Sequence, residues 1–158
     1  MAKNKTLSNC EIFKGIKAPA LGSIGAISEE VVVEQGDKIF SKAGEATYLY
    51  IINSGSVKLC LPVSILLREV EIDVEVKHPG DMIGWSALVP PHERALSAYA
   101  VEKSELLRIP GKELRALCEQ DEHLGYLVIS RVAAVIGHRL IRFDQMLAKE
   151  IELNASSM

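Results

Sequence analysis

Short runs of β-branched and large apolar residues fill residues 31–109, and they constrain the fold more than any other feature of the sequence. Groups of residues that favour turns interrupt these runs at positions 36–37, 44–45, 53–55, 79–81 and 90–91. Many short strands joined by turns are typical of an antiparallel sandwich or barrel. We therefore expect a mainly β protein, a double-stranded β-helix of the jelly-roll (β-roll) type, whose interior is often a small-molecule pocket.

Two segments allow more detailed predictions. Residues 48–52 and 57–61 flank Asn53, Ser54 and Gly55, where Gly55 or Asn53 can take a positive φ, so we predict a hairpin between them. Residues 69–77 alternate charged side chains with valine or isoleucine, which predicts a half-buried strand with one face in water.

After Pro110 and Gly111 the pattern becomes helical. Residues 112–119 predict a short helix, Asp121 is a suitable N-cap, and residues 121–153 predict a long helix that would span roughly 45 Å. One apolar stripe has a heptad-like spacing, and a second stripe contains Leu124, Val128, Val132 and Val135. We expect the second stripe to lie on the β-roll and the first to pair with the same helix of another copy; the alternative is that both stripes pack within one chain. The expected dimerisation residues are Ile129, Ala133, Ile136, Leu140, Phe143 and Leu147.

The length of 158 residues suits a single domain. We expect a frayed segment at 1–8, the β-roll with short flanking helices at 9–120, including a helical segment that starts at Cys10, and a tail at 154–158. A net charge of −3 argues against a basic field for nucleic acid. No run of consecutive apolar residues approaches the ~20 that span a bilayer, and the N-terminus lacks the apolar core of a signal peptide. We expect a cytoplasmic protein, away from the membrane, whose three cysteines are reduced thiols.

In the order and spacing of its motifs the sequence resembles the cyclic-nucleotide-binding domains of catabolite activators, protein kinase A regulatory subunits and cyclic-nucleotide-gated channels. The resemblance covers residues from about 10 to 138. It rests on IFKGI at 12–16, EQGDKIF at 34–40, AGE at 43–45, LYIINSGSVK at 49–58, PGDMIG at 79–84, and the pairs at 87–88 and 94–95.

The resemblance implies a phosphate-binding cassette, in which a glycine and an arginine stand ten residues apart, as Gly84 and Arg94 do. Arg94 would clamp an anion through charge-assisted hydrogen bonds, and backbone N–H groups near Ser86, Ala87 and Leu88 would face it. The implied ligand is cyclic AMP or cyclic GMP, although no cofactor follows with certainty. The expected ligand-binding residues are Gly84, Trp85, Ser86, Ala87, Arg94, Ala95 and Ser97.

Trp85 departs from the family pattern, because it replaces the glutamate that accepts a hydrogen bond from the ribose 2′-hydroxyl. Three roles for Trp85 stay open: stacking on a base, filling the ribose site, or packing in the core. Glu93, in place of the usual proline, is positioned to pair with Arg94 when the site is empty.

The leading hypothesis is a non-enzymatic regulatory sensor, a homodimer that relays ligand occupancy through its C-terminal helix. We expect no DNA-binding domain after this helix, so output would pass through a protein partner that the sequence does not identify. The main alternative is a degenerate scaffold that binds no nucleotide and acts through protein contacts. A metal enzyme on a cupin-like roll is disfavoured because the four histidines include no H-x-H pair, and a haem site at Cys60 and His78 has equally weak support.

Overall fold

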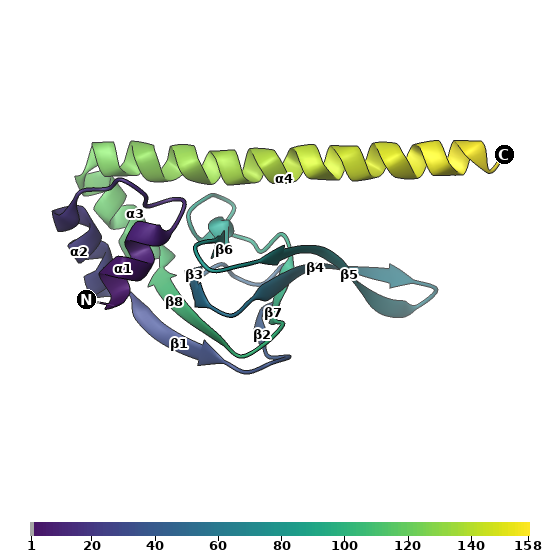
Figure 1. The fold of residues 1–158 in the computed structure, drawn as a ribbon. Coiled ribbons are helices and arrows are strands. Elements are labelled where there is room, and N and C mark those ends of the chain that lie inside the picture. The colour runs from purple at the N-terminus through teal and green to yellow at the C-terminus, as the bar shows by residue number, and fades with distance from the viewer. Residues whose placement is uncertain (1) are drawn as a thin grey trace.

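Eight strands form two four-stranded antiparallel sheets in the computed structural model, which describes residues 2–158 (Figure 1). The strand order is β1-β8-β3-β6 in the first sheet and β2-β7-β4-β5 in the second. This arrangement confirms the predicted mainly β roll with helices at both ends. The strands are β1 Glu29–Val33, β2 Lys38–Phe40, β3 Tyr48–Ser54, β4 Val57–Ile65, β5 Arg68–Lys77, β6 Met82–Ile83, β7 Ser97–Ala100 and β8 Ser104–Pro110.

Strand β3 contributes to two hydrophobic clusters because successive side chains of a strand point to opposite faces. Leu49 and Ile51 belong to the cluster between the first sheet and the helices, whereas Tyr50 and Ile52 belong to the cluster inside the roll. All four side chains are buried. The continuous apolar run of this strand therefore reflects two covered faces.

The predicted hairpin between β3 and β4 is wrong. Strand β3 pairs with β6 and β8, whereas β4 pairs with β5 and β7 of the other sheet. Gly55 has a φ of 84°, and a Cβ there would lie 2.1 Å from the Ser104 Oγ. The glycine turn thus carries the chain from one sheet to the other. The local sequence does not distinguish such a turn from a hairpin turn, because both need a residue with a positive φ.

The strand predicted at residues 69–77 is confirmed as β5, but its predicted half-buried face is wrong over most of its length. Strands β4 and β5 form a hairpin that projects beyond the other strands and runs beside the C-terminal helix (Figure 1). Val70, Ile72 and Val76 remain 41–46% exposed because no second layer covers this projection. At its tip, Leu66 and Leu67 are fully or almost fully exposed.

The expected frayed start is replaced by helix α1, Ala2–Asn9. Leu7 is completely buried in the cluster beneath the helices, and Lys3 Nζ donates to the Ser28 carbonyl at 2.6 Å. These contacts hold a segment that composition alone suggests is loose. The helical segment expected from Cys10 is a series of turns, and helix α2, Ala18–Ile27, follows it.

The C-terminal helices are α3, Gly111–Gln120, and α4, Glu122–Ser156, so α4 extends into the expected tail. Asp121 caps α4, because its side chain accepts a hydrogen bond from the Leu124 N–H at 3.1 Å. Val128 and Val132 are fully buried against the domain. Of the other stripe, Leu140 and Leu147 are 60% and 61% exposed, so the alternative that both stripes pack within one chain is wrong.

Helix α4 also contains an 18-residue stretch with a mean hydropathy of 1.4, and it is the one helix of residues 2–158 that is long and apolar enough to cross a membrane. A single helix of this length and composition is weak evidence for a membrane span, and 17% of the stretch is buried in the domain. The first part of the helix is also held on the domain, since Arg131 Nη1 donates to the Ile12 carbonyl at 3.2 Å.

Candidate ligand-binding site

The segment between β6 and β7 places Gly84 against the side chain of Arg94. Gly84 has a φ of 81°, and it precedes a short 3₁₀ helix, η1, at Trp85–Ala87. A Cβ at Gly84 would lie 2.5 Å from Arg94 Nη1 and 3.1 Å from the Tyr48 carbonyl oxygen. A glycine is required here for both its backbone conformation and its lack of a side chain. The two residues that the resemblance singled out therefore do lie together.

Arg94 is turned into the protein and is 4% exposed. Its Nη1 donates to the Gly84 carbonyl at 3.0 Å, and its Nη2 donates to the Tyr48 carbonyl at 2.6 Å. The guanidinium carbon lies 4.1 Å from the centroid of the Phe40 ring, an arrangement that adds a cation–π attraction. Three elements of the roll thus fix the position of this side chain.

The charge of Arg94 has no carboxylate partner among the ion pairs of residues 2–158. The expected pairing with Glu93 is wrong, because the Glu93 side chain is exposed and its backbone bridges Glu45. Burial lowers the pKa of Arg94, partly offset by the nearby Tyr50, and its Nε is buried without a hydrogen-bond partner. A buried cation in this condition is costly unless an anion compensates it.

The backbone N–H groups of η1 are less available than the resemblance implies. The Ala87 N–H donates to the Gly84 carbonyl at 3.1 Å, and the Leu88 N–H donates to the Trp85 carbonyl at 2.9 Å. The Ser86 carbonyl is paired with His92 Nδ1 at 2.8 Å. The N–H groups of Ala87 and Leu88 are therefore used within the turn and do not face an anion in this structure.

Trp85 is partly buried and packs against the cluster beneath the helices. It also lines a small cavity next to Arg94. Ala95 lines the same cavity. Ser97 Oγ instead accepts a hydrogen bond from the Lys42 N–H at 2.9 Å, and Ser97 is not among the lining residues. The cavity has a volume of about 10 Å³, which is about the room for one water molecule. Its lining residues are Phe40, Leu59, Gly84, Trp85, Ser86, Arg94, Ala95, Leu96 and Arg139.

Arg139 of α4 is a lining residue that the sequence analysis missed. Its side chain is 11% exposed, and its Nη2 lies 3.7 Å from Oε2 of Glu75 on the β4–β5 hairpin. The signal was present, since Arg139 follows Val128, Val132 and Val135 at steps of four, three and four residues. A charged residue in the next position of a buried stripe must lie against the domain.

Three cationic side chains surround the carboxylate of Glu75. Lys77 Nζ and Arg142 Nη1 each lie 2.8 Å from Glu75 Oε1, and Arg139 approaches the other oxygen. Burial alone would raise the pKa of Glu75, but Lys77 and the two arginines outweigh it and lower the pKa below its usual value. This cluster ties the hairpin to α4 beside the cassette.

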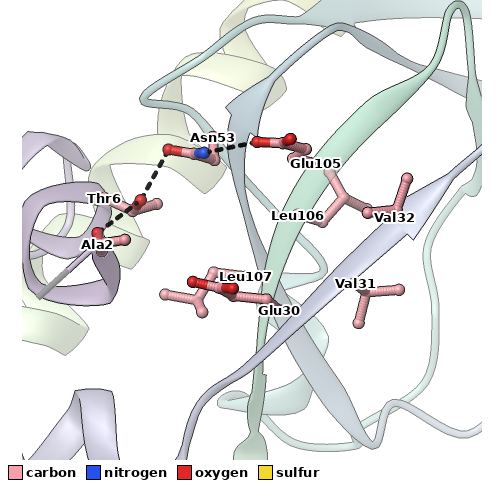
Figure 2. A pocket seen from close by; sticks show the side chains of 9 residues that line it. All are labelled: Ala2, Thr6, Glu30, Val31, Val32, Asn53, Glu105, Leu106 and Leu107. Carbon is pink, nitrogen blue, oxygen red and sulfur yellow. Dashed lines mark hydrogen bonds between the residues drawn. The ribbon is translucent and has the colours of Figure 1, made fainter.

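A larger cavity, of about 240 Å³, lies between α1 and the edge formed by β1 and β8 (Figure 2). Thr6 Oγ1 donates to Asn53 Oδ1 at 2.7 Å, and Asn53 Nδ2 donates to Glu105 Oε2 at 3.1 Å (Figure 2). None of the cassette residues lines this cavity. The hydrogen bonds of Thr6, Asn53 and Glu105 hold α1 on the sheet, whereas Glu30 lines the cavity without a hydrogen bond to these residues.

Comparisons with known proteins agree with this fold. The family model described as "Cyclic nucleotide-binding domain" matches residues 30–121. The chain is 32% identical over 133 residues to the cyclic AMP receptor protein of Thermus thermophilus, covering 84% of this chain and 58% of that protein. It is 24% identical over 129 residues to a candidate potassium channel protein of Rhodopseudomonas palustris, of which it covers 30%. The chain therefore spans less than two thirds of either relative.

Solved structures give the same assignment. A candidate cyclic nucleotide-binding protein of Geobacter metallireducens has a TM-score of 0.74 and 28% identity, with 89% of this chain and 99% of that chain covered. The catabolite activator protein of Thermus thermophilus has a TM-score of 0.70 and 28% identity, with 87% and 62% covered. The protein is a regulatory domain of the cyclic-nucleotide-binding type. The chain belongs to the family of cyclic nucleotide-binding domains.

Proposed function

We propose that the protein is a non-enzymatic, cytoplasmic sensor module that binds an anionic ligand at Arg94 and relays occupancy through α4. The observation that carries the proposal is the unpaired charge of Arg94, which is buried beside Gly84 with its Nε unsatisfied. A ligand phosphate would compensate this charge. The proposed contact residues are Gly84, Trp85, Ser86, Ala87, Arg94, Ala95 and Ser97, of which all but Ala87 and Ser97 line the small cavity.

A cyclic nucleotide is the ligand class that the family relationship favours. A relative that covers most of this chain is named a cyclic AMP receptor protein, and the cassette glycine and arginine are both present. The ribose would bind without the usual carboxylate, because Trp85 offers one N–H donor and no acceptor.

The relay depends on the exposed stripe of α4. Leu140, Leu147 and Ile151 are at least 60% exposed along one helix, a surface that a second copy of the chain would cover. In a homodimer formed through α4, a change at the cassette that moves α4 would also alter the interface between the two copies. Output would then reach a protein partner through the same helix.

The test is a calorimetric titration with cyclic AMP and cyclic GMP. Saturable binding is expected in the parent and in Arg108→Ala, a control arginine that stacks on Tyr48 and pairs with Glu29 at the surface. Arg94→Ala and Arg94→Lys are expected to lose saturable binding, because neither can present two N–H edges to a phosphate. Thermal melts of each variant report folding, and binding by Arg94→Ala at the parent affinity would contradict the proposal.

The small cavity favours a second candidate, a scaffold that binds no nucleotide. A volume of about 10 Å³ is far below that of a nucleotide, and Trp85 is one of the residues that line it. The substitution Trp85→Glu restores the carboxylate that the family uses. If it creates nucleotide binding where the parent has none, the scaffold function is supported; if the parent already binds and the substitution leaves the affinity unchanged, the scaffold function is excluded.

A further inference from the structure

Helix α4 brings a second arginine to the cassette cavity. Arg94 enters from the loop before β7, and Arg139 enters from α4, yet both line the same space. Each has a buried Nε that makes no hydrogen bond, and they are the two buried side-chain nitrogens of residues 2–158 in that state. Two unsatisfied donors with positive charge around one cavity are the chemistry of an anion site.

The charge balance around the cavity is positive. Arg94 has no ion pair, and Arg139 shares Glu75 with Lys77 and Arg142. Arg139 is the most distant of the three cations from Glu75, at 3.7 Å against 2.8 Å for the other two. Burial lowers the pKa of Arg139, so its charge is poorly solvated and only partly compensated. Arg139 is therefore the cation of this cluster with most to gain from another anion.

We propose that Arg139 and Arg94 together bind one phosphate group, so that α4 contacts the ligand directly. The inference rests on the proposed function and adds the residue through which occupancy reaches the helix. A phosphate is larger than the present cavity, so its entry moves the Arg139 side chain and weakens its contact with Glu75. Lys77 and Arg142 keep Glu75 paired, and the change is confined to the link between α4 and the hairpin.

The shared chemistry is a tetrahedral oxyanion, which a cyclic nucleotide or free inorganic phosphate can supply. The experiment therefore titrates three probes at constant ionic strength: cyclic AMP, cyclic GMP and inorganic phosphate. Heat of binding and the fluorescence of Trp85 are both recorded, since Trp85 is the single tryptophan and lines the cavity.

Arg139→Gln is expected to weaken binding of the bound probe by about tenfold or more, the loss of one charge-assisted contact. The matched control is Arg142→Gln, which removes a cation from the same helix and the same carboxylate but does not line the cavity. It is expected to bind within about twofold of the parent. Equal losses in both variants would show a general electrostatic effect and overturn the assigned contact.

Glu75→Gln provides a test with the opposite sign. It removes the carboxylate that competes for Arg139, so binding is expected to tighten several-fold, which a merely structural role for the cluster does not produce. Unchanged or weaker binding by folded Glu75→Gln would overturn the proposal, also where Arg139→Gln fails to fold.

The outcomes separate this inference from the proposed function. Nucleotide binding that is insensitive to Arg139→Gln overturns the inference and leaves nucleotide sensing intact. Binding of inorganic phosphate alone, lost in Arg139→Gln, supports the two-arginine site and overturns nucleotide sensing. A parent that binds none of the three probes overturns both.

Discussion

The two halves of α4 carry similar apolar periodicity but have different surroundings. In the first half, Val128 and Val132 are fully buried against the domain. In the second half, Leu140, Leu147 and Ile151 are 60–61% exposed, and the helix continues beyond the β-roll (Figure 1). Periodicity therefore predicts which face of a helix is apolar, but it does not predict what covers that face.

Arg139 lies at the border between these halves. Its guanidinium contacts Glu75 of the hairpin, and its Nε faces no partner beside the cassette. The first half of α4 is thus fixed by packing, the second half is free to meet another molecule, and the border is adjacent to the candidate ligand site. A signal from the cassette would enter α4 at this border.

The largest expected effect distinguishes the halves by burial. Val128→Asp places a carboxylate in the core without a partner and should lower the free energy of unfolding by about 4 kcal/mol or more. Ile151→Asp, the matched change in the exposed half, should change the stability of the isolated chain by less than about 0.5 kcal/mol. Urea unfolding at low protein concentration measures both, and similar losses in the two variants would remove the distinction.

Removal of residues 141–158 tests the exposed half. The deletion spares the buried stripe, so the β-roll should stay folded with its thermal transition, while the homodimer should dissociate to monomer. Analytical ultracentrifugation of the parent and the truncated chain gives the result. A dimer that survives the deletion contradicts the proposed interface.

Gly84→Ala tests how tightly the cassette is packed next to Arg94. The added Cβ would meet Arg94 Nη1 at 2.5 Å in a backbone with a φ of 81°, so we expect a loss of about 1–3 kcal/mol. Gly36→Ala is a matched control, because its φ is 86° but no atom lies within 4 Å of the added Cβ, and its cost should be about 1 kcal/mol. Equal losses of stability in the two variants would show that the Arg94 side chain moves away from the added Cβ without cost.

The smallest expected effect concerns the pH dependence of the Glu75 cluster. The pKa of Glu75 is lowered in the folded state, so its stabilisation is present above the usual glutamate pKa and is lost as the pH falls through the lowered value. Glu75→Gln should reduce the acid sensitivity of the melting temperature between about pH 6 and pH 3, an effect of less than about 1 kcal/mol for partly exposed partners. If the melting temperatures of the parent and the variant change with pH in parallel, the Glu75 ion pairs do not contribute to stability as proposed.

Local patterns predict most of the elements of this fold but fewer of their contacts. Alternation and turn residues correctly predict a β-roll, and Asp121 correctly predicts the start of α4. The hairpin at Gly55 is mispredicted because a positive-φ glycine serves a tight hairpin and a crossing between sheets equally well. Helix α1 is missed because its order comes from tertiary contacts of Leu7 and Lys3.

The candidate site shows the same division. Gly84 and Arg94, which the resemblance to the family pairs, do lie in contact, and both belong to one local segment. The partners of the Arg94 guanidinium, Phe40 and Tyr48, come from strands far away in the sequence. Arg139 could be found only by noting that a charged residue continues a buried stripe.

The most direct test of the account is the dissociation constant of the dimer, measured by sedimentation with and without saturating cyclic AMP. If cassette occupancy is coupled to α4, the constant should change by at least fivefold, and by linkage the combined affinity for the two nucleotides of one dimer should differ by the same factor from that of two monomers. The change should disappear in Arg94→Ala. A dissociation constant that is identical with and without the nucleotide would contradict the relay.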